Sequence, residues 1–226
     1  MTEVLTVWPG LLIAMFSSLV GSFAGGGTSL ITMPLLLFAF SMKYTSLLAV
    51  SKLSATVMTY MSGKIHKQKG SLNFKILAIL IIAGLIGTAI GTYLLQYKID
   101  ENLVKQILSI SLLVTVVYLL LAKNKGLTTQ ALQLDLKKIV VSFLIITFFN
   151  ILNGLVGGTG VFVTVFLVLY LKMSFITASA NMIISYAVIN SFQTPYLLLT
   201  EEVNWYLAGF MVVGSVLGAY LGTHLQ

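Results

Sequence analysis

Two runs of glycine interrupt apolar segments of this chain, and they constrain its fold more than any other feature. The first is Gly25-Gly26-Gly27, and the second lies in the stretch from Asn153 to Gly160. A glycine inside a helix costs about 1 kcal/mol relative to alanine, so each run predicts a helix break. Within a bilayer, a broken helix is tolerated only where protein or a water-filled cavity covers its free backbone groups. Two such breaks at matching places in two halves are typical of transporter binding sites.

The amino-acid composition indicates that most of the chain lies in a lipid bilayer. Hydrophobic residues make up 58% of the 226 positions and charged residues only 8%, which is too few charges to cover a soluble domain. Apolar runs of about 20 residues recur, so we predict an all-α, polytopic helical membrane protein with the lipid bilayer as its partner. All 13 basic residues are lysines, mostly between apolar runs, which indicates cytoplasmic loops and no binding of nucleic acid. There is no cysteine, and no cofactor or metal motif is evident.

The apolar runs predict whole spans and one short segment. Thr28 to Phe40 would be only about 20 Å long as a helix, so it predicts a half-helix or re-entrant segment. The predicted spans and basic loops follow along the chain: spans Thr45–Ser62, Phe74–Leu95 and Leu103–Ala122, with loops Gly63–Lys75 and Lys123–Lys138. His66 is expected to lie in the first of these loops.

The second half repeats the first at an offset of 131 residues. Gly87 and Gly91 fall on Gly218 and Gly222, and the two glycine breaks agree within a residue or two. Shared landmarks at one offset predict an internal duplication, with one repeat at residues 1–126 and the other at 127–226. The basic Gly63–Lys75 loop corresponds to a loop near Thr200 without lysine, which favours inverted repeats. The second repeat is expected to lack its last helix.

Lys52 is the most informative side chain. It lies near the middle of the predicted Thr45–Ser62 span, where a charge costs about 2.5–3.5 kcal/mol on insertion scales. All six acidic residues lie in loops or near the ends of the chain, so a buried ion-pair partner is missing at that depth. An anionic substrate would supply one. The alternative is a lysine that caps the carbonyls of a broken helix, or one that stays uncharged.

Helices that restart after the glycine breaks would direct their positive N-terminal ends into the protein, an arrangement that binds anions. We therefore expect a substrate site around Lys52, with no metal and no catalytic residues. Its predicted members are Gly25, Gly26, Gly27, Thr28 and Ser29 from the first break, and Asn153, Gly158, Thr159 and Gly160 from the second. The alternative is that the glycines serve only close helix packing. No midplane acid and no paired catalytic groups are present, which argues against cation exchange by carboxylates and against an enzyme.

The sequence resembles the TauE/SafE family of sulfite-exporter-like membrane transporters. The resemblance runs through Gly21–Pro34, Leu48–Thr56, Phe149–Gly160, Thr177–Ala180 and Glu202–Trp205, and so covers nearly the whole chain. In one branch of that family the Lys52 position belongs to a Thr-Asn-Lys pattern, where this chain has Val50-Ser51-Lys52. The same branch commonly has an acid in place of Gly21, and a lysine and an asparagine in place of Ile183 and Tyr186.

The resemblance implies a multi-pass carrier of small sulfur-containing anions, such as sulfite or sulfonates, in the plasma (inner) membrane. Export is favoured, because one negative charge gains about 2.3 kcal/mol per 100 mV when it leaves an interior that is negative. Two alternatives stay open: an ion-coupled importer of the same anions, and a non-transporting membrane subunit. The sequence also leaves open a homo-oligomer.

Overall fold

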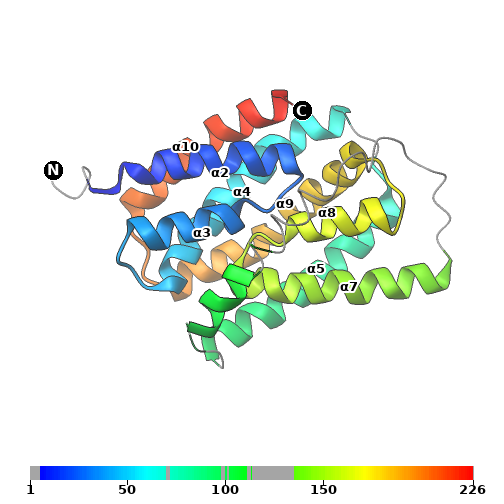
Figure 1. Cartoon of the computed structure of the whole chain (residues 1–226), viewed down its shortest axis with the longest axis horizontal. Helices are drawn as coiled ribbons and strands as arrows, with labels where there is room; N and C mark the ends of the chain where they lie inside the picture. The colour runs from blue at the N-terminus through cyan, green and yellow to red at the C-terminus, as the bar shows by residue number, and fades with distance from the viewer. Residues whose placement is uncertain are drawn as a thin grey trace.

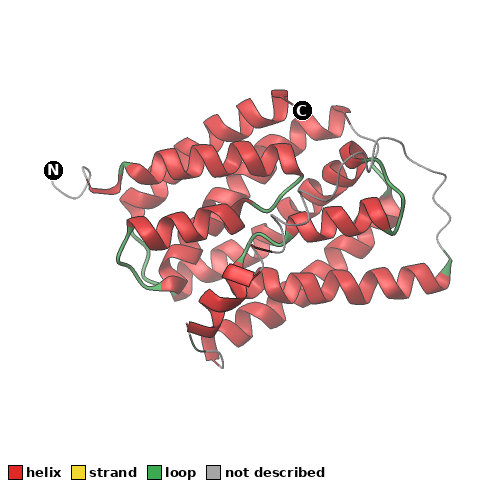
Figure 2. Cartoon of the chain, viewed as in Figure 1, coloured by secondary structure: helices red, strands yellow, loops and turns green. Residues whose placement is uncertain are grey.

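The computed structural model describes residues 6–69, 72–97, 100, 102–110, 113 and 135–225. Within these residues the chain is helical and contains no strand, which confirms the all-α prediction (Figures 1 and 2). The labelled helices are α2 (Pro9–Ala24), α3 (Thr28–Ala39), α4 (Tyr44–Lys69), α5 (Phe74–Tyr97), α7 (Leu136–Val156), α8 (Gly160–Leu169), α9 (Phe175–Thr200) and α10 (Trp205–Leu225).

Both predicted helix breaks are present. The first separates α2 from α3 at Gly25–Gly27, and the second separates α7 from α8 at residues 157–159. In Figure 1 the α2–α3 hairpin enters the bundle from the left, whereas the α7–α8 hairpin enters from the right. α3 has 12 residues and α8 has 10, so each short arm reaches only part of the way across a bilayer. The two breaks therefore lie inside the bundle.

Small residues hold the longer helices together in pairs. α10 packs along α2, and α5 packs along α7. Gly218 lies so close to α2 that an added Cβ would collide with the carbonyl oxygen of Met15. A Cβ added to Gly91 of α5 would likewise collide with the carbonyl oxygen of Ile151 in α7. Such residues let helix backbones approach closely in membranes. α4 and α9 pack against each other between these two pairs.

α4 differs from its predicted extent. The structure continues the helix to Lys69, so the prediction of a loop from Gly63 is wrong for residues 63–69. Polar packing explains the difference, because His66 is fully buried with Nε2 3.2 Å from the carbonyl oxygen of Ser22. Ser62 adds contacts with Ser22 at 2.8 Å and with Thr223 at 3.2 Å. His66 is thus a buried helical residue and not a loop residue.

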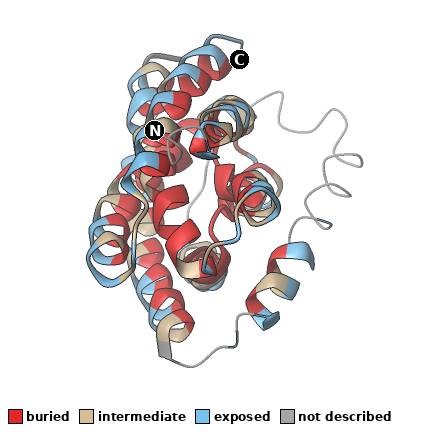
Figure 3. Ribbon diagram, turned by 90° about the vertical axis from the view of Figure 1, so that its left-hand side faces the viewer, coloured by how far each residue is buried: buried red, intermediate tan, exposed pale blue. Residues whose placement is uncertain are grey.

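The outer surface of the bundle is suited to hydrocarbon. Four of the described helices, α5, α7, α9 and α10, are long and apolar enough to cross a membrane. Large apolar side chains such as Phe38 and Leu199 point outward, and buried residues line the inside of the bundle (Figure 3). The predicted span Leu103–Ala122 is helical at its described residues, 103–110 and 113, and the rest lies outside the described residues. The predicted loop Lys123–Lys138 lies outside the described residues up to residue 134, where the proposed boundary between repeats falls, and its prediction is wrong for residues 136–138, which already belong to α7.

Candidate functional site

The two glycine breaks touch each other in the middle of the bundle. Gly27 and Gly158 have φ angles of +88° and +74°, a conformation that glycine adopts without strain. A Cβ added to Gly158 would collide with the backbone nitrogen of Leu30, and one added to Gly26 would lie 3.6 Å from the Cα of Gly160. The turns therefore require glycine both for backbone conformation and for space.

α3 and α8 both begin at this contact. The residues that precede them, Gly27 and Thr159, form no side-chain hydrogen bond to the first turn of either helix. The first N–H groups of a helix have no partner within the helix, and they carry the positive end of the helix dipole. Thr28 and Ser29, in the first turn of α3, are buried beside the break. The two helix starts thus direct backbone donors and hydroxyl groups toward one interior region.

Lys52 lies on α4 beside this region, with only 1% of its surface exposed. Its Nζ donates a hydrogen bond to Oδ1 of Asn153 at 3.1 Å. The amide nitrogen of Asn153 in turn donates to Thr88 Oγ1 of α5 at 3.4 Å. Ser51, the neighbour of Lys52, donates to Ser29 Oγ at 3.1 Å, which ties α4 to the start of α3. Lys52 is therefore held by Asn153, near the C-terminal end of α7, and its neighbour Ser51 is held by the first turn of α3.

No described carboxylate neutralises Lys52. The described acids, Asp100, Asp135, Glu201 and Glu202, lie beyond the ends of helices. The partner that the structure gives Lys52 is the neutral amide of Asn153, and an ammonium group has three protons to donate. Within the described ranges there is also no group of three His, Cys, Asp or Glu residues that could hold a metal ion. The chemistry available here is thus donation of hydrogen bonds from a cation, amides and hydroxyls.

A small cavity of about 10 Å³ lies between these groups, enough for about one water molecule. Six of the predicted site residues line it: Gly27, Thr28, Ser29, Lys52, Asn153 and Gly158. The other four do not. Gly25 packs on Ser179 and accepts a hydrogen bond from Thr164, Gly26 lies against Gly160, and the Thr159 hydroxyl donates to the Phe149 carbonyl at 2.7 Å. These four residues shape the turns behind the cavity.

The cavity has further lining residues that the sequence did not assign to the site. Thr59 comes from α4, and Tyr186 and Asn190 come from α9. Asn190 is 2% exposed, and its Oδ1 has no hydrogen-bond partner among the described residues. It stands one helical turn after Tyr186, so the two share a face of α9. The four-residue spacing of Tyr186 and Asn190 is visible in the sequence. Their position beside Lys52 is not, because it depends on the packing of α4 on α9.

Comparisons with known proteins agree with this architecture. The family model described as sulfite exporter TauE/SafE matches residues 10–226. A "Probable membrane transporter protein" of Haemophilus influenzae is 27% identical over 214 residues, which cover 94% of this chain and 82% of that protein. No solved structure matches. With a family match over nearly its whole length and a membrane-suited helical fold, this chain belongs to the sulfite exporter TauE/SafE family of membrane transporters.

Proposed function

We propose that this multi-pass transporter carries sulfite or a related small sulfur oxyanion, with the cavity at Lys52 as its binding site. The observation that carries the proposal is a buried lysine held by one neutral amide, between two helix starts without side-chain caps. An isolated buried cation is costly, and an anion in the cavity would offset that cost. Sulfite oxygens accept hydrogen bonds, and the surrounding groups are mainly donors.

The backbone of Gly27 and the side chains of Thr28 and Ser29 form the first lobe of the proposed site. Asn153 and Gly158 form the second, and Lys52 provides the charge between them. Gly25, Gly26, Thr159 and Gly160 support these lobes from behind. The cavity accommodates about one water and is smaller than sulfite, so α4 and α9 have to separate for the anion to enter.

Alternating access between two inverted repeats is the transport mechanism that we propose. Tyr60 and Ser191 are 131 residues apart, the offset of the internal repeat, and their hydroxyl groups lie 2.7 Å apart. Contact between equivalent residues is expected where a twofold axis passes between them. The opposite entry of the two hairpins in Figure 1 and the matched pairs α2–α10 and α7–α5 support the same arrangement. Transporters built in this way rock one repeat against the other around a fixed site.

Export across the plasma membrane is the direction that needs no coupling ion. A monovalent anion gains about 2.3 kcal/mol per 100 mV on leaving a negative interior, which corresponds to a gradient of roughly 50-fold. The described part of the span region offers no carboxylate to carry a proton or cation inward.

Flux of sulfite in proteoliposomes with an imposed potential tests the proposal. The variants are Lys52→Gln and, as a matched control, Lys64→Gln, which removes an exposed lysine from the same helix. We expect wild type and Lys64→Gln to carry sulfite toward the positive side, and Lys52→Gln to lose at least about 90% of the flux while staying folded. Equal flux in all three would refute the site. Flux that follows an ion gradient against the potential would favour a coupled importer, and absence of flux in wild type would favour a non-transporting subunit.

A further inference from the structure

The residues that line the cavity at Lys52 are all buried, and the contacts at one end of α9 suggest what covers it, an inference that rests on the proposed function. Lys52, Ala55 and Thr59 line the cavity from α4, and Tyr186 and Asn190 line it from α9. A path to the cavity between these helices requires them to part at one end. Thr194, one turn beyond Asn190 on α9, still bonds α4 through Thr56 Oγ1 at 2.8 Å. Contacts farther along α9 would therefore control one entrance.

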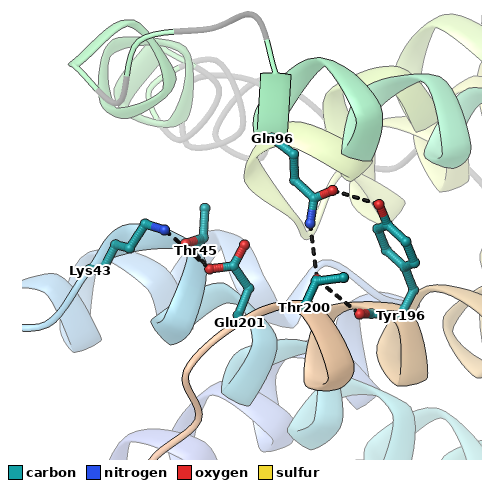
Figure 4. Close-up of polar contacts among 6 residues, drawn as sticks. All are labelled: Lys43, Thr45, Gln96, Tyr196, Thr200 and Glu201. Atoms are coloured by element: carbon teal, nitrogen blue, oxygen red, sulfur yellow. Dashed lines mark hydrogen bonds and ion pairs between the residues drawn. The ribbon is translucent and has the colours of Figure 1, made fainter.

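The first of those contacts is made by Glu201, the residue that follows α9. Its carboxylate accepts hydrogen bonds from the hydroxyl of Thr45 and from Lys43 Nζ, which lies 3.4 Å away (Figure 4). Both partners lie at the start of α4. The side chain of Glu201 is only 8% exposed, whereas that of Lys43 is 68% exposed. A shielded carboxylate is screened less by salt than a surface one, so salt weakens these contacts less than it weakens a contact between two exposed side chains.

The second set of contacts ties the same end of α9 to α5. Tyr196 donates from its hydroxyl to Gln96 Oε1 at 2.6 Å, and Gln96 Nε2 donates to Thr200 Oγ1 at 3.0 Å (Figure 4). The last turn of α9 is therefore bonded to α4 on one side and to α5 on the other. We call the six residues Lys43, Thr45, Gln96, Tyr196, Thr200 and Glu201 the latch.

The distribution of lysine assigns a side of the membrane to the latch. Lys64, Lys67 and Lys75 lie where α4 ends and α5 begins, and Lys137 and Lys138 lie at the start of α7. In Figure 1 these segments are at the right, whereas the start of α4 and the end of α9 are at the left. Because cytoplasmic loops carry an excess of lysine, the lysine-rich end faces the cytoplasm and the latch faces outward.

We propose that Glu201 is a positioning residue for transport, and that the latch is the outer gate of the path to Lys52. It acts through helix position and does not touch the anion. Breaking it separates the end of α9 from α4 and α5, and exposes the cavity to the outer side only. An exporter needs such an opening to release its anion.

Accessibility of a cavity cysteine tests the gate without any need for transport. The chain has no native cysteine, so Ala55→Cys places a single reporter sulfhydryl in the cavity wall. The probe is a membrane-impermeant charged methanethiosulfonate, applied separately to each side of oriented vesicles. Glu201→Gln and Thr45→Val are introduced on this background. Glu202→Gln is the matched control, because Glu202 is the exposed neighbouring acid.

We expect Glu201→Gln and Thr45→Val each to raise the labelling rate from the outer side about tenfold, the effect of losing one charge-assisted hydrogen bond. Labelling from the cytoplasmic side and in Glu202→Gln should not change. An unchanged rate, or an equal increase from both sides, would overturn the gate even if the protein carries sulfite. A one-sided increase supports it even if wild type carries no sulfite, which separates failure of the gate from failure of the proposed substrate.

A second measurement tests whether cross-linking the latch in its closed position blocks the path to the cavity. Thr45→Cys with Glu201→Cys, bridged by a short bifunctional thiol reagent, should block flux and outer access, and cleavage of the bridge should restore both. Persistent access in the bridged protein would contradict the assignment.

Discussion

Replacing Asn153 by aspartate tests whether a substrate anion binds at Lys52. In Asn153→Asp the carboxylate would stand about where the amide oxygen now lies, 3.1 Å from Lys52 Nζ. The attraction between unit charges at that distance is about 5 kcal/mol at an effective dielectric constant of ~20. Burial of the carboxylate costs several kcal/mol, so the two terms nearly cancel. We therefore expect a folded protein with stability close to that of wild type.

Binding of the substrate should nevertheless fail in this variant. A sulfite ion in contact with Lys52 Nζ would lie within about 5 Å of the new carboxylate, and the repulsion there is about 3 kcal/mol. That energy weakens binding by a factor of more than ~100. The measurement is the rise in melting temperature with added sulfite, since a ligand that binds only the native state stabilises it. We expect the rise to disappear in Asn153→Asp.

Asn153→Leu is the control, because it removes the amide without adding charge. It should weaken sulfite binding by roughly tenfold, the loss of one polar contact, and so lie between wild type and the aspartate variant. If Asn153→Asp bound sulfite as tightly as wild type, the anion would not be held at Lys52, and the proposed site would be wrong.

Three further predictions concern contacts that hold the helices and the glycine turns together. Gly218→Ala should lower the free energy of unfolding in detergent by about 1–3 kcal/mol, because its methyl group collides with the Met15 carbonyl oxygen; Gly209→Ala on the same helix meets nothing within 4 Å and should leave stability unchanged or slightly higher. Gly158→Ala should cost about 2–5 kcal/mol, since it combines a φ of +74° with a collision against Leu30; a melting temperature like that of wild type would contradict the described turn. Tyr44→Phe should cost about 0.5–1.5 kcal/mol, measured by denaturation, through loss of the 3.1 Å bond to the Leu155 carbonyl.

Much of the architecture was predictable because lipid restricts a chain so strongly. Long apolar runs with few charges can only become helices in a bilayer, and the glycine runs identify where two of them stop. The end of α4 was not predictable by the same reasoning. Lys64, His66 and Lys67 are typical of a loop. In the structure Ser22 contacts His66, and Ser22 and Thr223 both contact Ser62 just before this segment, so packing against other helices lets α4 continue.

The lining of the candidate cavity was predictable only in the part that local sequence determines. Lys52 stands out because a charge is rare inside an apolar span, and Thr28, Ser29 and Asn153 stand beside the glycine breaks. Tyr186 and Asn190 look like ordinary residues of an apolar helix, and their position at the cavity depends on how α9 packs against α4. Glu201 lies 156 residues from its partner Thr45, so a contact between them follows from the fold and not from any local pattern.

The most direct test of the central claim is to locate the bound anion. Selenite has the shape and charge of sulfite, and its selenium atom gives an anomalous diffraction signal in crystals grown with it. We expect a selenium peak within hydrogen-bonding reach of Lys52 Nζ and Ser29, in the cavity between the two glycine breaks, and no such peak in Lys52→Gln. A peak elsewhere in the bundle, or one that persists without the lysine, would show that Lys52 does not hold the anion.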